Sequence, residues 1–76
     1  MEKLVEYVAK ALVDHPENVV VEVTRDSPEE QAIELRVDPE DRGRVIGKSG
    51  RTAHAIRALL MAAAPEGRTV TLEIVD

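Results

Sequence analysis

The residues whose types and spacing best suit chemistry are Gly47-Lys48-Ser49-Gly50. Two glycines three positions apart let the backbone turn sharply through positive φ angles and let another chain come close. The residues after Gly50 have a helical pattern, so the tetrapeptide lies at a predicted helix N-terminus. Unpaired N–H groups and the positive end of the helix dipole gather at such a position. The sequence therefore predicts a turn that favours a phosphate group.

Basic residues concentrate around this turn. The window from Arg42 to Arg57 contains five Lys and Arg residues and no Asp or Glu, whereas the whole chain has a formal net charge of −5. The basic members of the window are Arg42, Arg44, Lys48, Arg51 and Arg57. A chance grouping on one helix is the simpler alternative, but the coincidence with the glycine pair favours a basic binding surface.

Size and composition exclude several classes of protein. The 76 residues are expected to form one domain, residues 1–76, with a core too small for a deep active site, so we do not expect an enzyme. The chain has no cysteine, which excludes disulfides and thiolate metal sites. His15 and His54 lack the spacing of metal ligands, and we interpret His15 as a solvated residue at a helix end. We therefore expect neither a metal nor a cofactor.

Aromatic residues are almost absent, since Tyr7 is the only one. Single-strand binders of the OB and RRM kinds stack bases on Phe, Tyr or Trp, so their mode of binding is excluded. The first residues form neither an apolar signal core nor a run long enough to span a bilayer. We expect a cytoplasmic protein without a membrane segment.

Hydrophobic periodicity predicts an α+β fold with the element order α-β-β-α-α-β. The short link between the first two strands predicts an antiparallel hairpin, and the later crossover favours parallel pairing. Asp38 followed by Pro39 predicts the start of the second helix, which ends at Gly47. The result is a three-stranded mixed sheet with three helices on one face. The predicted helices cover residues 2–13, 38–47 and 51–64, and the predicted strands cover 19–25, 33–37 and 69–74.

Two features of the predicted helices leave alternatives open. Val45 and Ile46 can line a groove beside the turn or pack into the core. The spacing of residues 53, 56, 59 or 60, and 63 marks the buried face of the long helix, while Arg51, His54 and Arg57 share its polar side. His54 either contacts a phosphate or is solvated. A strip of small residues with Met61 nearby reflects either helix propensity or a surface for a partner, and it consists of Ala55, Ala58 and Ala62.

The element order and the run GRVIGKSGR at residues 43–51 together resemble the type II, bacterial form of the KH domain. This resemblance covers the whole chain. In length and layout the chain is similar to the small stand-alone bacterial KH proteins of the KhpA/YlqC family. It implies a cytoplasmic protein that binds single-stranded RNA as an RNA chaperone or post-transcriptional regulator. It also implies a homodimer, or a heterodimer with a second KH-containing protein of the KhpB/Jag kind.

The resemblance also implies roles for individual residues. The backbone of the Gly47–Gly50 turn would lie against the phosphates of about four nucleotides. Val45 and Ile46, with Ile33 or Val37, would form the wall of the groove that receives the bases. Lys48 would add charge and Ser49 a hydroxyl, and the edges of the groove would be held by Arg42, Arg44, Arg51 and Arg57.

Two rival functions remain. A nucleotide-binding P-loop needs four residues between its first glycine and Gly-Lys-Ser, whereas three follow Gly43 here. A P-loop also follows a strand, and here a helix is predicted. The second rival is a KH fold that pairs with proteins and does not bind RNA. The acid-free basic window and Lys48 argue against that alternative.

Overall fold

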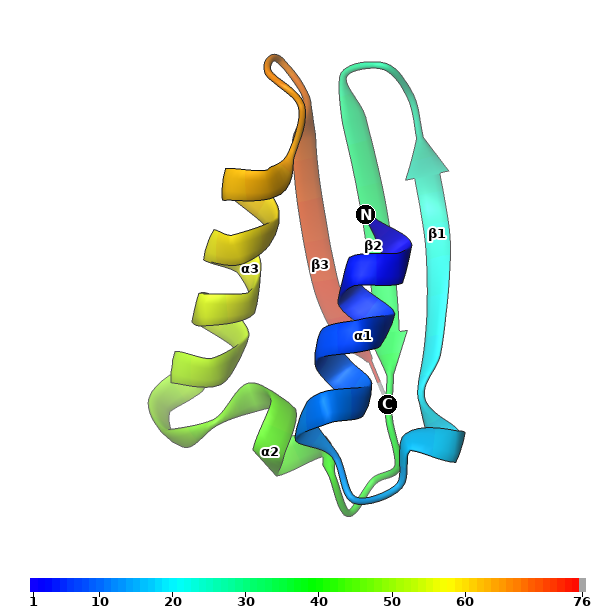
Figure 1. Cartoon of the computed structure of the whole chain (residues 1–76), viewed down its shortest axis with the longest axis vertical. Helices are drawn as coiled ribbons and strands as arrows, with labels where there is room; N and C mark the ends of the chain where they lie inside the picture. Colours follow the sequence, from blue (N-terminus) through cyan, green and yellow to red (C-terminus); the bar gives the residue numbers. More distant parts are fainter. Residues whose placement is uncertain (76) are drawn as a thin grey trace.

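A three-stranded sheet with helices packed against one face forms the architecture of this α+β protein (Figure 1). The computed structural model describes residues 1–75. The elements are the helices α1 (Glu2–Leu12), α2 (Arg42–Ile46) and α3 (Arg51–Ala63), the 3-10 turns η1 (Pro16–Asn18) and η2 (Lys48–Gly50), and the strands β1 (Val20–Asp26), β2 (Glu30–Arg36) and β3 (Thr69–Val75). The predicted order α-β-β-α-α-β is confirmed.

The sheet has the order β1-β2-β3, with the hairpin strand β2 in the centre. Strands β1 and β2 are antiparallel, and the Ser27 side chain accepts a hydrogen bond from the Glu30 N–H at 3.1 Å to close their turn. Strands β2 and β3 are parallel, because the chain crosses over through α2 and α3 between them. Both predicted pairings are confirmed.

Alternation along the strands separates the two faces of the sheet. Ile33 and Leu35 of β2 and Leu72 of β3 are buried under α1 and α3. The helices contribute aliphatic residues of their own to this core, namely Val5 and Ala9 from α1 and Ile56 and Leu60 from α3. The opposite face is polar, and it carries three glutamates side by side in register: Glu22, Glu34 and Glu73.

The prediction of three helices on one face is only partly right. Helices α1 and α3 lie over the sheet, whereas α2 is five residues long and packs against α3 and α1 near the end of the sheet (Figure 1). No helix within residues 1–75 has the length and apolar character needed to cross a membrane.

The predicted start of the second helix at Asp38 is wrong, since α2 begins at Arg42. Asp38 instead closes a turn, in which its Oδ1 accepts a hydrogen bond from the Glu40 N–H at 2.9 Å. The local pattern of an Asx residue followed by proline suits such a turn as well as it suits a helix cap. The four residues before Arg42 are therefore a connection that positions α2.

Asp41 joins this connection to the one that follows α1. Its side chain is 2% exposed and accepts hydrogen bonds from the N–H groups of Asp14 at 3.2 Å and His15 at 2.9 Å. The His15 ring Nδ1 lies 2.9 Å from the same carboxylate. Burial raises the pKa of Asp41, but these hydrogen bonds outweigh it and hold the pKa below its ordinary value. The hydrogen bond between the two side chains has the opposite effect on His15, because it raises the pKa of the imidazole above its ordinary value.

Replacing Asp41 tests the importance of this buried carboxylate. Asp41→Ala leaves two backbone N–H groups and an imidazole without their acceptor, so we expect the melting temperature to fall by more than roughly 8 °C. Glu40→Gln is the matched control, because its side chain is 80% exposed and contacts only His15, in an ion pair of 4.0 Å, among the described residues. We expect that control to shift the melting temperature by less than about 4 °C. Equal melting temperatures for the two variants in circular dichroism scans would show that Asp41 does not anchor the fold.

Candidate nucleic-acid interface

The Gly47–Gly50 turn between α2 and α3 has an unusual backbone. Gly47 has φ 77° and ψ 168°, Ser49 has φ 57° and Gly50 has φ 74°. Left-handed φ angles of this kind favour glycine, so the turn depends on its two glycines and holds Ser49 in a costly conformation. The Gly50 N–H donates to the Gly47 carbonyl at 3.1 Å and closes the turn. The predicted sharp turn with positive φ angles is confirmed.

Gly47 also meets a steric limit that the sequence does not reveal. A Cβ atom at this residue would lie 2.2 Å from Thr52 Oγ1 and 2.7 Å from the Thr52 backbone nitrogen. The first turn of α3 therefore folds directly onto Gly47. A Cβ at Gly50 would meet nothing within 4 Å, so the surface above Gly50 is open to a ligand.

Helix α3 begins at this open surface without a side-chain cap. Its N-cap residue is Gly50, no side chain hydrogen-bonds to the cap, and its first turn contains no acidic residue. The first N–H groups of an α-helix have no partner within the helix and carry its positive dipole end. The Arg51 N–H donates back to the Lys48 carbonyl, so the N–H groups that follow it at the start of this 13-residue helix are the ones that can hold an anionic group.

The basic residues of the window differ in what they contact. Lys48 and Arg51 are exposed, and neither forms an ion pair within the described part of the chain. Arg44 pairs with Asp14, with 3.0 Å between Nη2 and Oδ2. Arg57 donates from Nε to the carbonyl of Leu72 on the edge strand β3 at 3.2 Å.

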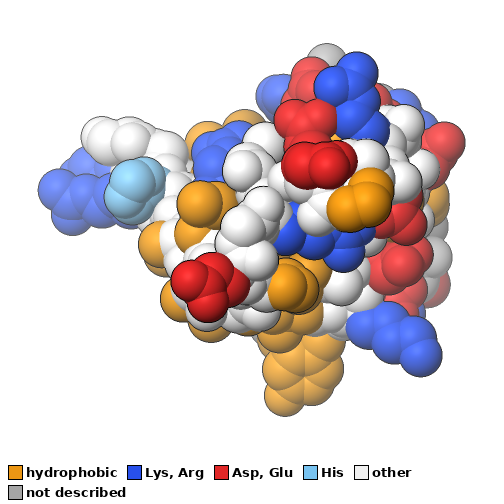
Figure 2. Space-filling view, turned by 90° about the horizontal axis from the view of Figure 1, so that it is seen from above, with side chains coloured by type: hydrophobic (Ala, Val, Ile, Leu, Met, Phe, Trp, Pro, Cys, Tyr) orange, Lys and Arg blue, Asp and Glu red, His pale blue; other side chains and the backbone are white. Residues whose placement is uncertain are grey.

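Two further members of the predicted site lie at different depths. Arg42 is half-buried, whereas His54 is exposed on α3, three residues after Arg51. Figure 2 shows a histidine and a basic side chain projecting together from the side of the molecule on which α3 lies in Figure 1. The structure thus brings Lys48, Ser49, Arg51 and His54 together around the turn, while Arg42, Arg44 and Arg57 lie further from it or have intramolecular partners.

The structure differs most from the prediction at the aliphatic wall of the groove. Val45 is 0% exposed and belongs to the core, which settles the alternative left open for it. Ile33 and Val37 are buried as well, so neither reaches the surface beside the turn. Ile46 is half-buried next to Gly47 and is the one member of the predicted wall that solvent reaches. The described residues enclose no pocket, so the candidate interface is an open surface.

The P-loop alternative fails on the structure as it did on spacing. A P-loop runs from a strand directly into its glycine-rich turn. Here α2 leads into Gly47, whose N–H donates to the Gly43 carbonyl at 2.8 Å as the end of that helix. The turn therefore joins two helices, as the resemblance to the KH fold implied.

Comparison with known proteins agrees with this geometry. The family model described as the KH domain of KhpA/KhpB matches residues 2–74. The chain belongs to the KhpA/KhpB KH-domain family. It is 53% identical over 70 residues to the RNA-binding protein KhpA of Leifsonia xyli subsp. xyli, covering 92% of this chain and 90% of that protein.

Other members of the KhpA/KhpB family match the chain over a similar extent. The RNA-binding protein KhpA of Halalkalibacterium halodurans is 51% identical over 77 residues, with all of both chains covered. The RNA-binding protein KhpA of Treponema pallidum is 49% identical over 78 residues, covering 99% of this chain and 94% of that protein. The predicted KH fold and the predicted family are confirmed.

The two glycines of the turn are expected to respond differently to substitution. Gly50→Ala places a Cβ in open space, so its main cost is that alanine has to adopt a left-handed backbone conformation. We expect a loss of about 1 kcal/mol in the free energy of unfolding. Gly47→Ala adds the clash with Thr52, and we expect a loss at least about 2 kcal/mol larger. Urea unfolding followed by circular dichroism measures both values. Equal losses would contradict a tight contact between Gly47 and α3.

Proposed function

We propose that this protein binds single-stranded RNA on the surface formed by the Gly47–Gly50 turn and the first turn of α3. The observation that carries the proposal is the exposed pair Lys48 and Arg51, free of ion pairs within the described chain, beside a helix start that has no cap. Its relatives in the family are named RNA-binding proteins. We place the activity in the cytoplasm, as that of an RNA chaperone or post-transcriptional regulator without catalysis of its own.

In this proposal the turn backbone holds phosphates and the side chains add charge. The N–H groups that follow Arg51 at the start of α3 would donate to a phosphate, with the side chains of Lys48 and Arg51 on either side of it. The Ser49 hydroxyl adds a hydrogen-bond donor, and Ile46 offers an aliphatic contact to a base. The outer part of the surface, which positions the RNA chain without being essential, consists of Arg42, Arg44, His54 and Arg57.

The proposed site is also the part of the molecule where a phosphate chain meets least repulsion. All fifteen acidic residues lie outside the window 42–57, and three of them are adjacent on the open face of the sheet. Phosphates are attracted to basic side chains and repelled by acidic ones over roughly one Debye length, about 8–10 Å. The RNA is therefore expected to contact the helical side of the molecule and to avoid the open face of the sheet.

Charge reversal at the turn tests the proposed function. Lys48→Asp with Ser49→Asp introduces two acids at the phosphate position, and we expect RNA affinity to fall at least about tenfold, measured by fluorescence anisotropy with a labelled single strand. Circular dichroism and melting should change little, because both side chains are exposed.

A matched control separates a local effect from a change in net charge. Lys3→Asp makes the same charge change as the single variant Lys48→Asp, but on the exposed surface of α1. We expect Lys3→Asp to retain RNA affinity within about threefold. Unchanged affinity in the Lys48/Ser49 double variant, or an equal loss in the two single variants, would mean that the turn is not the RNA site.

We further propose that the protein forms a homodimer through α3 and pairs with a second KH-containing protein of the KhpB kind through the same helix. The exposed surface of α3 is divided, with Arg51 and His54 at its start and mostly apolar or small residues after them. Arg57 is the exception, and its Nε donates to the Leu72 carbonyl of β3. Leu59 is 44% exposed and Met61 55% exposed. Ala55, Ala58 and Ala62 are exposed between them and allow a partner helix to come close. Leu60, the neighbour of Leu59, is 1% exposed and belongs to the core.

Substitution of the apolar residues tests the dimer. Leu59→Asp with Met61→Asp is expected to shift the mass measured by light scattering at micromolar concentration from dimer to monomer, since charge at an interface is costly. Tyr7→Asp is the control, because Tyr7 is a large side chain that is 73% exposed on a different helix, α1. A wild-type protein that is already monomeric, or a dimer lost only in the Tyr7 variant, would contradict the proposal.

A further inference from the structure

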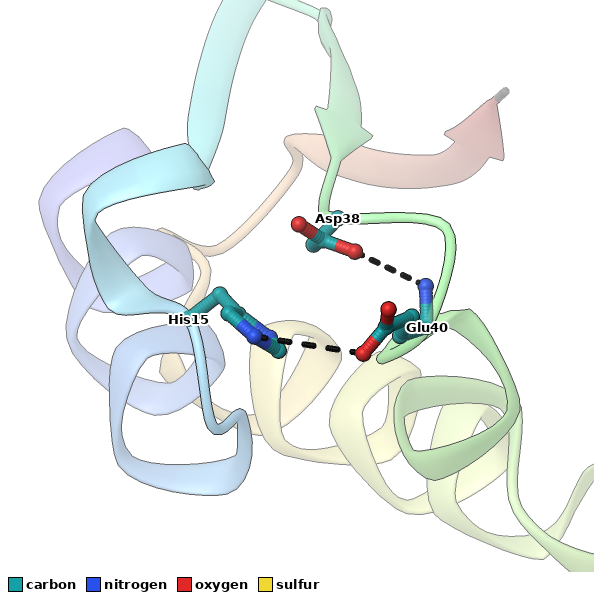
Figure 3. Close-up of side chains that lie close together, drawn as sticks. All are labelled: His15, Asp38 and Glu40. Atoms are coloured by element: carbon teal, nitrogen blue, oxygen red, sulfur yellow. Dashed lines mark hydrogen bonds and ion pairs between the residues drawn. The ribbon is translucent and has the colours of Figure 1, made fainter.

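One cluster of side chains lies outside the candidate RNA interface and combines an imidazole with two carboxylates. His15 precedes η1, while Asp38 and Glu40 lie in the turn between β2 and α2. Their three side chains point toward one another (Figure 3). One nitrogen or oxygen from each lies within 4.8 Å of the others, and the distance between His15 Nε2 and Glu40 Oε2 is 4.0 Å.

The His15 ring is oriented by a residue that is not itself part of the cluster. The buried Asp41 carboxylate lies 2.9 Å from His15 Nδ1 and also accepts the His15 backbone N–H. A hydrogen bond from Nδ1–H to Asp41 leaves Nε2 with a lone pair directed at the cluster. Histidines that bind metals in proteins nearly always donate their second ring N–H to a carboxylate or carbonyl in this way. The arrangement of Asp41 and His15 thus supplies the support that a metal ligand needs.

We propose that His15, Asp38 and Glu40 bind a divalent transition-metal ion, and that zinc is the ion their donors fit best. One imidazole nitrogen with two carboxylate oxygens is a donor set that zinc accepts, with a fourth position left for water. Magnesium and calcium prefer oxygen donors alone, so the histidine disfavours them. The proposal does not depend on RNA binding.

The required movement is small and falls on an exposed side chain. Zinc–ligand distances of about 2.0–2.1 Å in a tetrahedron separate neighbouring ligand atoms by about 3.3 Å. The Glu40 side chain is 80% exposed, so it is able to close the distance to Nε2. Asp38 is already held at both oxygens, by the Glu40 N–H and the Asn18 side chain, each at 2.9 Å, and each oxygen retains a lone pair.

A bound ion would join two connections of the fold. His15 belongs to the link between α1 and β1, whereas Asp38 and Glu40 belong to the link that leads into α2. The ion would bind the folded chain and not the unfolded one, so it would raise the melting temperature in a concentration-dependent manner. It would also reinforce the segment from which α2 and the glycine turn extend.

The proposal is tested by titrating the metal-free full chain with zinc chloride in an isothermal calorimeter. The pH is set well above the ordinary histidine pKa of about 6.5, because the hydrogen bond to Asp41 raises the pKa of His15. We expect one zinc ion per chain, a higher melting temperature with zinc, and no change in melting temperature with magnesium. Glu40→Gln keeps the fold and removes one charged ligand, so we expect zinc affinity to fall at least about tenfold. His15→Gln should remove the binding.

His54→Gln is the matched control for zinc binding, because His54 is exposed on α3 in a basic stretch without a carboxylate ligand. We expect this variant to bind zinc as the wild type does. Absence of zinc binding by the wild type overturns the proposal. So does an unchanged zinc affinity in the Glu40 variant, and so does loss of binding in the His54 variant with retention in the His15 variant.

Discussion

The helical side of the molecule depends on the hydrogen bonds that the buried carboxylate of Asp41 accepts. It accepts the N–H groups of Asp14 and His15, two residues that leave the end of α1 and would otherwise lack acceptors in a partly buried position. Because Asp41 immediately precedes α2, the same contact fixes where that helix starts. A five-residue helix has too few internal hydrogen bonds to hold itself, so its position has to come from contacts of this kind.

The geometry of the glycine turn follows from constraints at both ends of α2. Asp41 fixes the start of the helix, and Val45, which is fully buried, fixes its inner face. At its end, Gly47 lies so close to Thr52 that α3 has to begin within a narrow range of directions. The Gly47–Gly50 turn between α2 and α3 is therefore held in an unfavourable backbone conformation by the residues around it. Strained backbone persists in folded proteins when the surrounding structure holds it in this way. A rigid turn presents its N–H groups to a ligand without first having to order them.

The sequence predicted the order and type of the elements well because each strand and each long helix has its own hydrophobic period. It failed where a residue contacts a distant segment. Asp38 and Pro39 form a local pattern that suits either a helix start or a turn, and the choice is made by Asp41, whose partners lie 26 and 27 residues away. Val45 and Ile46 are neighbours on a helix and face about 100° apart, so only one of them can face the core. Nothing local indicates which one does.

The candidate site was predicted as a set of residue types, and the structure separates that set by partner. Five basic residues have similar positions in the sequence, yet Arg44 is paired with Asp14 and Arg57 supports the edge strand through the Leu72 carbonyl. These partners come from the connection after α1 and from β3, so no spacing rule within residues 42–57 could have revealed them. Lys48 and Arg51, which have no such partner within residues 1–75, are next to the turn, where a bound phosphate would gain most from them.

The division of α3 would connect the proposed RNA binding with the proposed self-association. The first residues of α3 lie beside the Gly47–Gly50 turn. The apolar residues on the outward face of the helix begin about four residues later. A helix of 13 residues is about 20 Å long, so a partner packed on the later part leaves the first turn uncovered. A two-fold axis perpendicular to α3 would place two such turns at opposite ends of a shared helix pair. One RNA strand that reaches both turns would then gain affinity from their effective concentration, which compensates for the small basic surface of a single acidic domain.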